Sequence, residues 1–310
     1  MCPVLDLFLI AEEAQSVQSR VFVETLDKAM RLLQSENGQL GNLRITNRLV
    51  TLEPLGEALV IGDLHGDLES LLVMLQESEF LQKMERTKDA TLIFLGDYGD
   101  RGDSSAEIYF MILKLKLAFP EQIILMRGNH EGPMDLVASP HDLPFQFQGR
   151  FGEDWMHVYE KTRILWTYLY NAVFVAGRFL MIHGGVSPEI SGLQDIAQAR
   201  ENHNEASLED LLWNDPAEGM HGVSSSPRGA GKLFGKDVTE QVLGRVNAKI
   251  LIRGHEPSDS GFKINHDGKV LTLFSRKGSP YYNSCGAYLQ LPLSEKFENA
   301  RQLIPWIHKF

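Results

Sequence analysis

Short apolar runs recur along the chain, and each ends abruptly in glycine, in a polar residue or in both. A run of four or five apolar residues has the length of a buried strand, and a glycine after it allows a tight turn. The sequence therefore predicts buried strands whose carboxyl ends lead into polar loops. Six runs follow this pattern: ALVI before Gly62-Asp63, TLIFL before Gly96-Asp97, IILM before Arg127-Gly128-Asn129, FLMI before His183-Gly184, KILI before Arg253-Gly254-His255 and VLTLF before Ser275.

Helical patterns lie between the first of these strands. The stretch SSAEIYFMILKLKLAFP predicts a helix with Ser104 and Glu107 as a capping box and an end before Pro120. Alternation of strands and helices predicts an α/β or α+β fold whose functional loops follow the strands. Four leucines would share one face of an earlier helix: Leu68, Leu71, Leu72 and Leu75.

The first 45 residues differ from the rest because they are rich in Glu, Gln and Leu. We interpret residues 1–45 as an N-terminal helical extension that packs on a single catalytic domain spanning residues 46–310. A separate binding module is the alternative interpretation of the extension. Its apolar positions with helical spacing are Val21, Leu26, Met30 and Leu33.

Composition narrows the class of protein. The 310 residues are 43% hydrophobic and 23% charged, which is typical of a globular chain. The net charge of −11 argues against nucleic-acid binding, which uses a basic face. No stretch approaches 18 uninterrupted apolar residues, and no basic segment precedes the first apolar run, so we expect neither a membrane span nor a secretory signal. With only two cysteines, Cys2 and Cys285, we expect no disulfide framework and a cytoplasmic protein.

The polar residues after the strands are types that bind divalent metal ions. Carboxylate, carboxamide and imidazole groups together suit Mn, Fe or Zn. A single Asp or His in a loop is more often structural, but five glycine-flanked clusters behind strands would each need a separate structural reason. The candidate metal ligands are Asp63, His65, Asp97, Asn129, His183 and His255.

Five motifs occur in the order GDLHGD, GDYGDRG, RGNHE, IHGG and RGHEP. Together with LLWNDP, PRGAGKLFG and VLTLFS, they resemble the signature series of the phosphoprotein phosphatases, the metal-dependent serine/threonine phosphatases of the calcineurin-like metallophosphoesterase superfamily. The resemblance covers roughly residues 57–290, and the compact chain is more similar to prokaryotic members. It implies a β-sandwich flanked by helices, with a binuclear metal site in the loops at the carboxyl ends of the strands.

The resemblance implies two divalent ions as cofactors, with Mn²⁺ favoured and Fe or Zn as alternatives. Asp97 would bridge the two ions, and the first would also be bound by Asp63 and His65. A hydroxide held between the ions would attack phosphorus directly, without a phosphoenzyme intermediate. The second ion would also take Asn129, His183 and His255.

The resemblance also assigns a proton donor and phosphate contacts. His130 would be the general acid for the leaving alkoxide, and Asp100 would orient its imidazole, whose ordinary pKa of about 6.5 suits this role. Asp215 would support a metal ligand. The planar fork of arginine matches two phosphate oxygens at once. The expected phosphate contacts are Arg101, Asn129 and Arg228.

Some positions depart from the family pattern. Gly99 stands where Val is usual, and Asp67 stands where Gln is frequent. The loop after VLTLFS lacks the family's SAPNYC sequence, and either Tyr281 or Tyr282 could take the place of its tyrosine. We assign the histidines outside the motifs to the surface or the core: His141, His157, His203, His221, His266 and His308.

The implied activity is hydrolysis of phosphoserine and phosphothreonine in phosphoproteins or phosphopeptides, and the sequence names no regulatory subunit. The alternative is hydrolysis of small phosphoanhydrides or phosphodiesters, such as dinucleoside polyphosphates, with the same metal chemistry. Enzymes of that kind tend to carry GNHD rather than the GNHE found here. An inactive binding protein would have lost metal ligands, and none is lost here.

Overall fold

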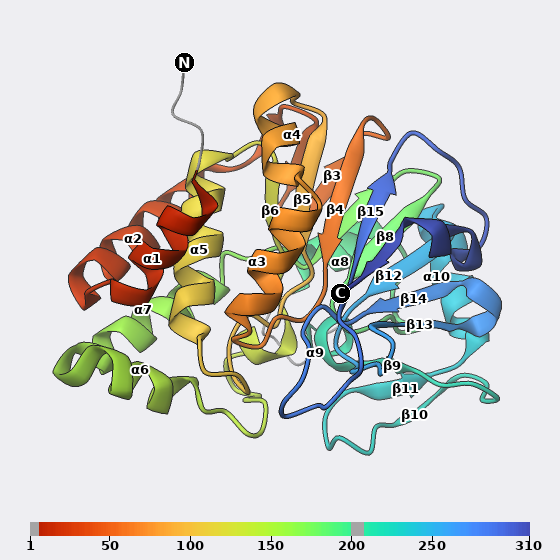
Figure 1. Ribbon diagram of the computed structural model, residues 1–310. Helices are drawn as coiled ribbons and strands as arrows, with labels where there is room; N and C mark the ends of the chain where they lie inside the picture. The colour runs from red at the N-terminus through yellow and green to blue at the C-terminus, as the bar shows by residue number, and fades with distance from the viewer. Residues whose placement is uncertain (1–5, 200–207) are drawn as a thin grey trace.

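Two β-sheets lie face to face at the centre of the computed structural model, which describes residues 6–199 and 208–310 (Figure 1). One continuous apolar cluster includes Leu59 and Leu289 from one sheet and Met181 and Ile252 from the other. Helices cover the outer face of each sheet (Figure 1). The predicted β-sandwich flanked by helices is therefore confirmed.

The smaller of these two sheets contains the first three predicted strands. In spatial order its strands are β16 (Ile307–Lys309), β15 (Ala287–Pro292), β4 (Glu57–Ile61), β5 (Ala90–Phe94) and β6 (Ile123–Leu125). β4, β5 and β6 run parallel, whereas β15 pairs antiparallel with β4 and β16 antiparallel with β15. Every residue of β5 and β6 is buried, as expected for parallel strands covered on both faces.

The larger sheet contains the other three predicted strands. Its spatial order is β1 (Gly38–Leu40), β2 (Leu43–Thr46), β3 (Leu49–Leu52), β7 (Ala172–Val175), β8 (Phe179–Ile182), β12 (Ile250–Arg253), β14 (Val270–Leu273) and β13 (Phe262–Asn265). β8, β12 and β14 are parallel neighbours. A small separate sheet has the order β10 (Val223–Ser225), β11 (Lys232–Phe234) and β9 (Asp215–Pro216).

Parallel strands from the two large sheets converge at their carboxyl ends. Asp63, just after β4, forms an isolated parallel bridge with Phe274, just after β14. The N–H of Gly62 donates to Ser275 Oγ at 2.7 Å, and that hydroxyl donates to Ala287 O at 2.6 Å. The loops that follow strands of both sheets are thereby brought to one edge of the sandwich.

The α-helices are α1 (Leu7–Ser16), α2 (Ser19–Ser35), α3 (Leu68–Glu77), α4 (Phe80–Arg86), α5 (Ser105–Ala118), α6 (Leu143–Phe151), α7 (Trp155–Trp166), α8 (Leu193–Gln198), α9 (Leu208–Trp213) and α10 (Lys236–Val246). A 3-10 turn, η1 (Asn129–Glu131), follows β6. Within the described residues, none of the helices is both long and apolar enough to cross a membrane.

Helix α5 begins and ends where the sequence predicted, but the predicted capping box of Ser104 and Glu107 does not form. Ser104 occupies the N-cap position without a capping hydrogen bond from its side chain. Gln146 of α6 instead accepts a hydrogen bond from the Ser105 N–H at 3.3 Å, so a neighbouring helix supplies the cap. The helix ends at Ala118, before Pro120, as predicted.

The N-terminal segment contains two helices, and its helical part ends at Ser35. Residues 38–46 instead form β1 and β2, which extend the larger sheet. The buried face of α2 includes Phe22, whose ring contacts three aromatic rings of α5 and α6, whereas Val21 is 41% exposed. The helical spacing therefore predicted the buried positions Leu26, Met30 and Leu33 correctly and was wrong by one position at Val21.

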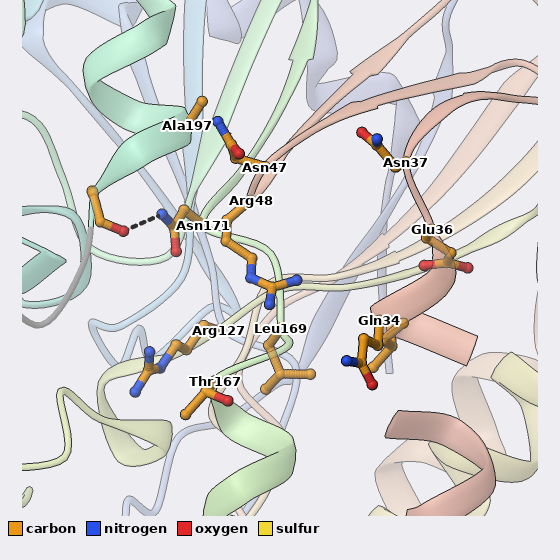
Figure 2. Close-up of a pocket in the computed structure, with 12 residues that line it drawn as sticks. Gln34, Glu36, Asn37, Asn47, Arg48, Arg127, Thr167, Leu169, Asn171 and Ala197 are labelled. Atoms are coloured by element: carbon orange, nitrogen blue, oxygen red, sulfur yellow. Dashed lines mark hydrogen bonds between the residues drawn. The ribbon is translucent and has the colours of Figure 1, made fainter. Parts of the chain in front are cut away.

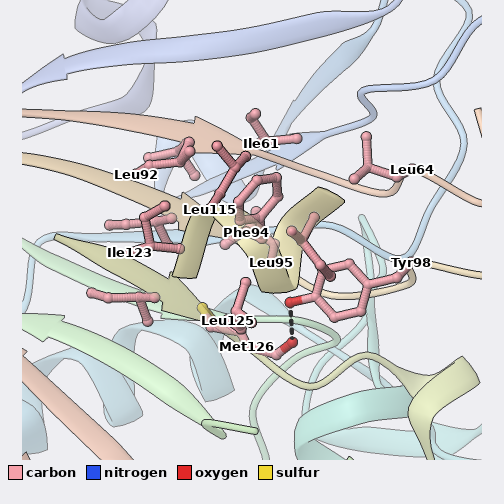
Figure 3. Close-up of a cluster of buried hydrophobic side chains, with 14 of the residues drawn as sticks. Ile61, Leu64, Leu92, Phe94, Leu95, Tyr98, Leu115, Ile123, Leu125 and Met126 are labelled. Atoms are coloured by element: carbon pink, nitrogen blue, oxygen red, sulfur yellow. Dashed lines mark hydrogen bonds between the residues drawn. The ribbon is translucent and has the colours of Figure 1, made fainter. Parts of the chain in front are cut away.

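Figure 3 shows the part of the core beneath the loops at the strand ends. Phe94, the last residue of β5, and Leu95, which follows it, lie among aliphatic side chains of β4 and β6, including Ile61 and Leu125. The buried hydroxyl of Tyr98 donates to the carbonyl of Met126 at 2.7 Å (Figure 3). This bond ties the loop after β5 to the end of β6.

A buried ion pair connects the N-terminal helices to the sandwich. Nζ of Lys116 in α5 lies 2.6 Å from Oε1 of Glu36, which follows α2. The same ammonium group donates to the carbonyls of Pro120 and Ile123. The Tyr170 hydroxyl also donates to Glu36. The side chains of Lys116 and Glu36 are 1% and 2% exposed, so loss of one partner would leave a buried charge without its counter-ion.

We expect Lys116→Met to lower the free energy of unfolding by about 3–5 kcal/mol, because Glu36 would remain buried and unpaired. Urea denaturation followed by circular dichroism measures this change. The matched control is Lys114→Met, since Lys114 pairs with Glu13 at the surface and should contribute no more than about 1 kcal/mol. Equal effects of the two substitutions would contradict a structural role for the buried pair.

Candidate active site

The predicted metal ligands come together at the edge where the strand ends converge. None of the six side chains is more than 5% exposed. Loops after both large sheets contribute: Asp63 and His65 follow β4, Asp97 follows β5, Asn129 begins η1 after β6, His183 follows β8 and His255 follows β12.

Asp97 lies between the ligands from the two sheets. Its Oδ2 is 3.4 Å from His65 Nε2, and its Oδ1 is 3.4 Å from His183 Nε2. The carboxamide of Asn129 lies 3.1 Å from His183 Nε2 and 2.8 Å from His255 Nδ1. Asp97 therefore belongs to two groups of residues that could each bind a metal ion. In each group the potential ligand atoms lie within 4.8 Å of one another. These groups are His65, Asp97 and His130, and Asp97, His183 and His255.

Hydrogen bonds to backbone carbonyls orient two of the histidines. Nδ1 of His65 donates to the carbonyl of Gly99 at 3.0 Å, and Nδ1 of His183 donates to the carbonyl of Leu95 at 2.9 Å. Nε2 of each ring therefore faces a carboxylate oxygen of Asp97, and in the neutral form of the ring this nitrogen would carry the lone pair that binds a metal. A cation between such acceptors stabilises the arrangement, and metal-binding histidines commonly have this second hydrogen bond.

The charges of the site also fit divalent cations. Burial and the neighbouring Asp97 raise the pKa of Asp63 to about 7, and Asp63 Oδ2 has no hydrogen-bond partner. Burial lowers the pKa of His183, but Asp97 and Asp63 outweigh it and raise that pKa to about 9. Both shifts reflect buried negative charge that a metal ion would offset. The carboxylate, carboxamide and imidazole donors match Mn, Fe or Zn.

For two other histidines, His65 and His255, burial outweighs the attraction of the carboxylates and lowers the pKa. It lowers the pKa of His65 to about 3, with a further contribution from His130, despite the opposing charge of Asp97. The pKa of His255 is also well below its ordinary value, because of burial and of the positive charges of His183 and Arg253. Neutral imidazoles are the form that binds metals, so these shifts favour ligation near neutral pH.

Several site residues hold a left-handed backbone that is uncommon for residues with a side chain. Glu131, to which the sequence analysis assigned no role, supports one of them: its Oε2 accepts from the N–H groups of Asp97 at 2.8 Å and Gly128 at 3.0 Å. Its Oε1 accepts from the N–H of Tyr98 at 2.9 Å. Such conformations persist where surrounding contacts over-determine them. The residues concerned are His65, Asp97, Asp100, Arg101 and His255.

The predicted proton donor and its partner are in contact. Nδ1 of His130 donates to Oδ2 of Asp100 at 2.6 Å, and both side chains are buried. The His130 ring also lies edge-on to His65, with centroids 4.7 Å apart. Burial lowers the pKa of His130, but the Asp97 and Asp100 carboxylates outweigh it and raise the pKa above its ordinary value. The imidazolium form of His130 is therefore favoured, as a proton donor requires.

The two predicted phosphate-binding arginines have different surroundings. Arg101 follows Asp100 directly, and its Nη2 donates to the carbonyl of Ser139 at 2.9 Å. Arg228, in the loop between β10 and β11, donates from Nε to Asp215 Oδ2 at 2.6 Å. Asp215 also lies 3.8 Å from Nε2 of His255, which places it beside a predicted metal ligand.

The structure separates the two tyrosines that the sequence left as alternatives. The ring of Tyr281 stacks on His65 with centroids 5.7 Å apart, and Cζ of Arg276 lies over the Tyr281 ring, 5.3 Å from its centroid. Tyr282 is 80% exposed. Arg276 also donates to the carbonyl of His65 at 3.1 Å, so the loop after β14 packs against the site through Tyr281.

His141, like Glu131, lies at the site although the sequence predicted no role for it there. It was assigned to the surface or core, but its Nδ1 lies 2.9 Å from Oδ2 of Asp100. No motif surrounds it, so sequence pattern offered no signal. The other assignments are confirmed for His266, which is buried, and for the exposed histidines, whereas His203 lies outside the described residues. The exposed histidines are His157, His221 and His308.

A cavity of about 600 Å³ lies apart from the predicted ligands. Figure 2 shows Arg48, Arg127 and Asn171 among the polar side chains that line it. It reaches from the end of α2 to Ala199 after α8. None of the predicted site residues is among the described residues that line this cavity.

Comparison with known proteins identifies the family. The sequence profile of the calcineurin-like phosphoesterases matches residues 57–259, which is more than half of the chain and contains all six predicted ligands. The chain belongs to the calcineurin-like phosphoesterase family.

Sequence relatives of this phosphoesterase are named as serine/threonine phosphatases. A probable serine/threonine-protein phosphatase of Encephalitozoon cuniculi is 34% identical over 248 residues, which are 78% of this chain and 52% of that protein. The chain thus spans about half the length of this relative. The serine/threonine-protein phosphatase 4 catalytic subunit of Eremothecium gossypii is 33% identical over 232 residues, or 73% of this chain and 70% of that protein.

Solved structures support the fold. A protein serine/threonine phosphatase from Saccharomyces cerevisiae superposes with a TM-score of 0.76 and covers 95% of this phosphoesterase and 90% of that chain, at 21% identity. A cold-active protein-tyrosine phosphatase from a psychrophilic Shewanella has a TM-score of 0.55, with 81% and 78% coverage and 17% identity. At these identities the similarity establishes the shared fold alone.

We expect Asp97→Asn to lower the metal content of the purified protein and to abolish the rise in Tm that Mn²⁺ produces in the wild type, because binding to the folded state stabilises it. Plasma mass spectrometry and differential scanning calorimetry measure the two effects.

The matched control is Asp267→Asn, because Asp267 is also an aspartate with a left-handed backbone but forms a surface ion pair with Lys236. Its metal content and Mn²⁺ response should equal those of the wild type. A Mn²⁺-dependent rise in Tm that persists in Asp97→Asn would exclude Asp97 as a shared ligand.

Proposed function

We propose that this phosphoesterase is a serine/threonine protein phosphatase that acts on phosphoproteins or phosphopeptides. The observation that carries the proposal is the buried hydrogen bond from Nδ1 of His130 to Oδ2 of Asp100, 2.6 Å long, beside the potential metal ligands around Asp97. A serine or threonine alkoxide is a poor leaving group, so its ester benefits most from a placed proton donor. The names of the sequence relatives support the same substrate class.

The six predicted ligands would hold two divalent ions, for which we propose Mn²⁺ with Fe or Zn as alternatives. When bound, such ions supply charge stabilisation for the phosphoryl group and lower the pKa of a water that serves as nucleophile. The chain's own contribution is orientation: carbonyls of Leu95 and Gly99 set the ring nitrogens of His183 and His65, and Glu131 holds the loop that carries Asp97.

The proton for the leaving group would come from Nε2 of His130. Because Nδ1 remains bonded to Asp100, the transferable proton of the imidazolium is the one on Nε2. The leaving seryl or threonyl oxygen would take that proton as its bond to phosphorus breaks. Asp100 keeps the ring in place and stabilises its charged form before the transfer.

Arg101 and Arg228 would bind the phosphate oxygens with Asn129. The Nε of Arg228 is held by Asp215, so its terminal nitrogens are the groups that would meet the phosphate. We also infer a cytoplasmic location, since the sequence contains only two cysteines.

A direct comparison of substrates tests the proposed function. The Mn²⁺-loaded protein should hydrolyse a phosphoserine peptide and show little turnover of diadenosine tetraphosphate, because its acid serves an alkoxide leaving group. Phosphate release and nucleotide chromatography measure the two reactions. Turnover of the dinucleotide with the phosphopeptide untouched would overturn the proposal and favour a phosphoanhydride hydrolase.

Substitution of the acid tests its assigned role. His130→Asn should retain the metal content of the wild type and lower kcat on the phosphoserine peptide by about 10²–10⁴, the usual contribution of a general acid. His157→Ala is the control, because His157 is exposed on α7. Wild-type kcat in His130→Asn would remove His130 from the mechanism.

A further inference from the structure

Asp100 accepts four hydrogen bonds, and only one of them comes from His130. Its Oδ1 accepts from the backbone N–H groups of Asp142 at 2.9 Å and Leu143 at 2.7 Å. Its Oδ2 is shared between Nδ1 of His130 at 2.6 Å and Nδ1 of His141 at 2.9 Å. A second histidine thus contacts the same carboxylate oxygen as the proposed acid.

The protonation of this cluster follows from its contacts. Burial raises the pKa of Asp100, but the hydrogen bonds from His130 and His141 outweigh it and hold the pKa well below its ordinary value. An ionised carboxylate only accepts hydrogen bonds, so both Nδ1 atoms carry hydrogen. Nε2 of His141 in turn forms a hydrogen bond with the Tyr159 hydroxyl at 2.8 Å. The resulting chain runs His130–Asp100–His141–Tyr159.

The segment that carries His141 also holds the neighbouring arginine. Oδ1 of Asp142 accepts from the N–H of Arg101 at 3.0 Å, and the carbonyl of Ser139 accepts from Arg101 Nη2 at 2.9 Å. Residues 139–143 therefore contact both Asp100 and Arg101, which have backbone φ angles of 66° and 72°. Strained conformations of this kind persist where several contacts hold them.

We propose that His141, held by Tyr159, is a positioning residue that keeps Asp100 aligned with the proton donor His130. The proposal rests on the proposed function of His130 and extends it to a residue that no motif marks. The two backbone N–H groups hold only Oδ1, and His141 is the side chain that binds Oδ2 together with His130. Without it the carboxylate can turn away, and the imidazole loses its orientation.

Leaving groups of different quality separate this role from a general structural one. An alkoxide or phenoxide departs slowly without a proton, whereas p-nitrophenoxide departs readily without one. A residue that acts through the acid should therefore affect a phosphoserine peptide and phenyl phosphate more than p-nitrophenyl phosphate. A residue that only supports the fold should affect all three substrates equally.

We expect His141→Ala to lower kcat on the phosphoserine peptide and on phenyl phosphate by about tenfold, which is typical when a supporting partner of a site residue is lost. Its kcat on p-nitrophenyl phosphate should stay within about twofold, and KM and metal content should not change. His141→Asn should recover part of the loss, because its carboxamide N–H can donate to Asp100. Tyr159→Phe should show a smaller loss with the same substrate dependence.

His157→Ala is the matched control, since it removes an exposed histidine from α7, the helix that carries Tyr159. Equal losses on all three substrates in His141→Ala, or no loss on any of them, would overturn the proposal. Failure of the proposed function is recognised separately, because the wild type would then leave the phosphopeptide untouched. The ratio of phenyl phosphate to p-nitrophenyl phosphate turnover still decides the role of His141 in that case.

Discussion

The site is organised around a carboxylate, Asp97, that is buried where two sheets meet. A buried carboxylate is costly unless positive charge or hydrogen-bond donors surround it. Here the N–H of His130 donates to its Oδ1 at 3.0 Å, and the Nε2 atoms of His65 and His183 approach from opposite sheets at 3.4 Å each. Burial raises the pKa of Asp97, but the nearby histidines outweigh it and keep that pKa well below its ordinary value. Asp97 therefore stays ionised, and polar groups from the loops of both sheets surround its carboxylate.

Close backbone contact is what permits this arrangement. A Cβ atom on Gly128 would lie 2.2 Å from Asp97 Oδ1, and one on Gly96, whose φ is 109°, would lie 2.4 Å from the nitrogen of Gly128. Neither position accepts a side chain without displacing the loop. The two glycines let the loops after β5 and β6 come into contact. The Glu131 carboxylate then accepts hydrogen bonds from the backbone of both loops, at Asp97 and at Gly128. Asp97, which lies in this contact, has a left-handed backbone with a φ of 57°.

Much of this fold could be predicted from the sequence because its signals are local. Buried parallel strands need continuous apolar runs, and all six runs form strands that end within about a residue of the predicted turn. The family motifs also marked every predicted ligand. Non-local partners replaced the local signals that failed: Gln146 of α6 caps α5 in place of Ser104, and Phe22 packs against aromatic rings of α5 and α6 where Val21 was expected.

The order of residues along the chain is enough to place carboxylate, carboxamide and imidazole groups at the strand ends, and therefore to predict a metal-dependent phosphoesterase site. That Tyr281 rather than Tyr282 lies against His65, and that His141 shares Asp100 with His130, depends on how distant segments pack together. Residues 100 and 141 are separated by helix α5, strand β6 and the η1 turn, so no periodicity connects them. Their contact exists because α6 and the segment before it fold back over the loop after β5, which is a property of packing and not of local pattern.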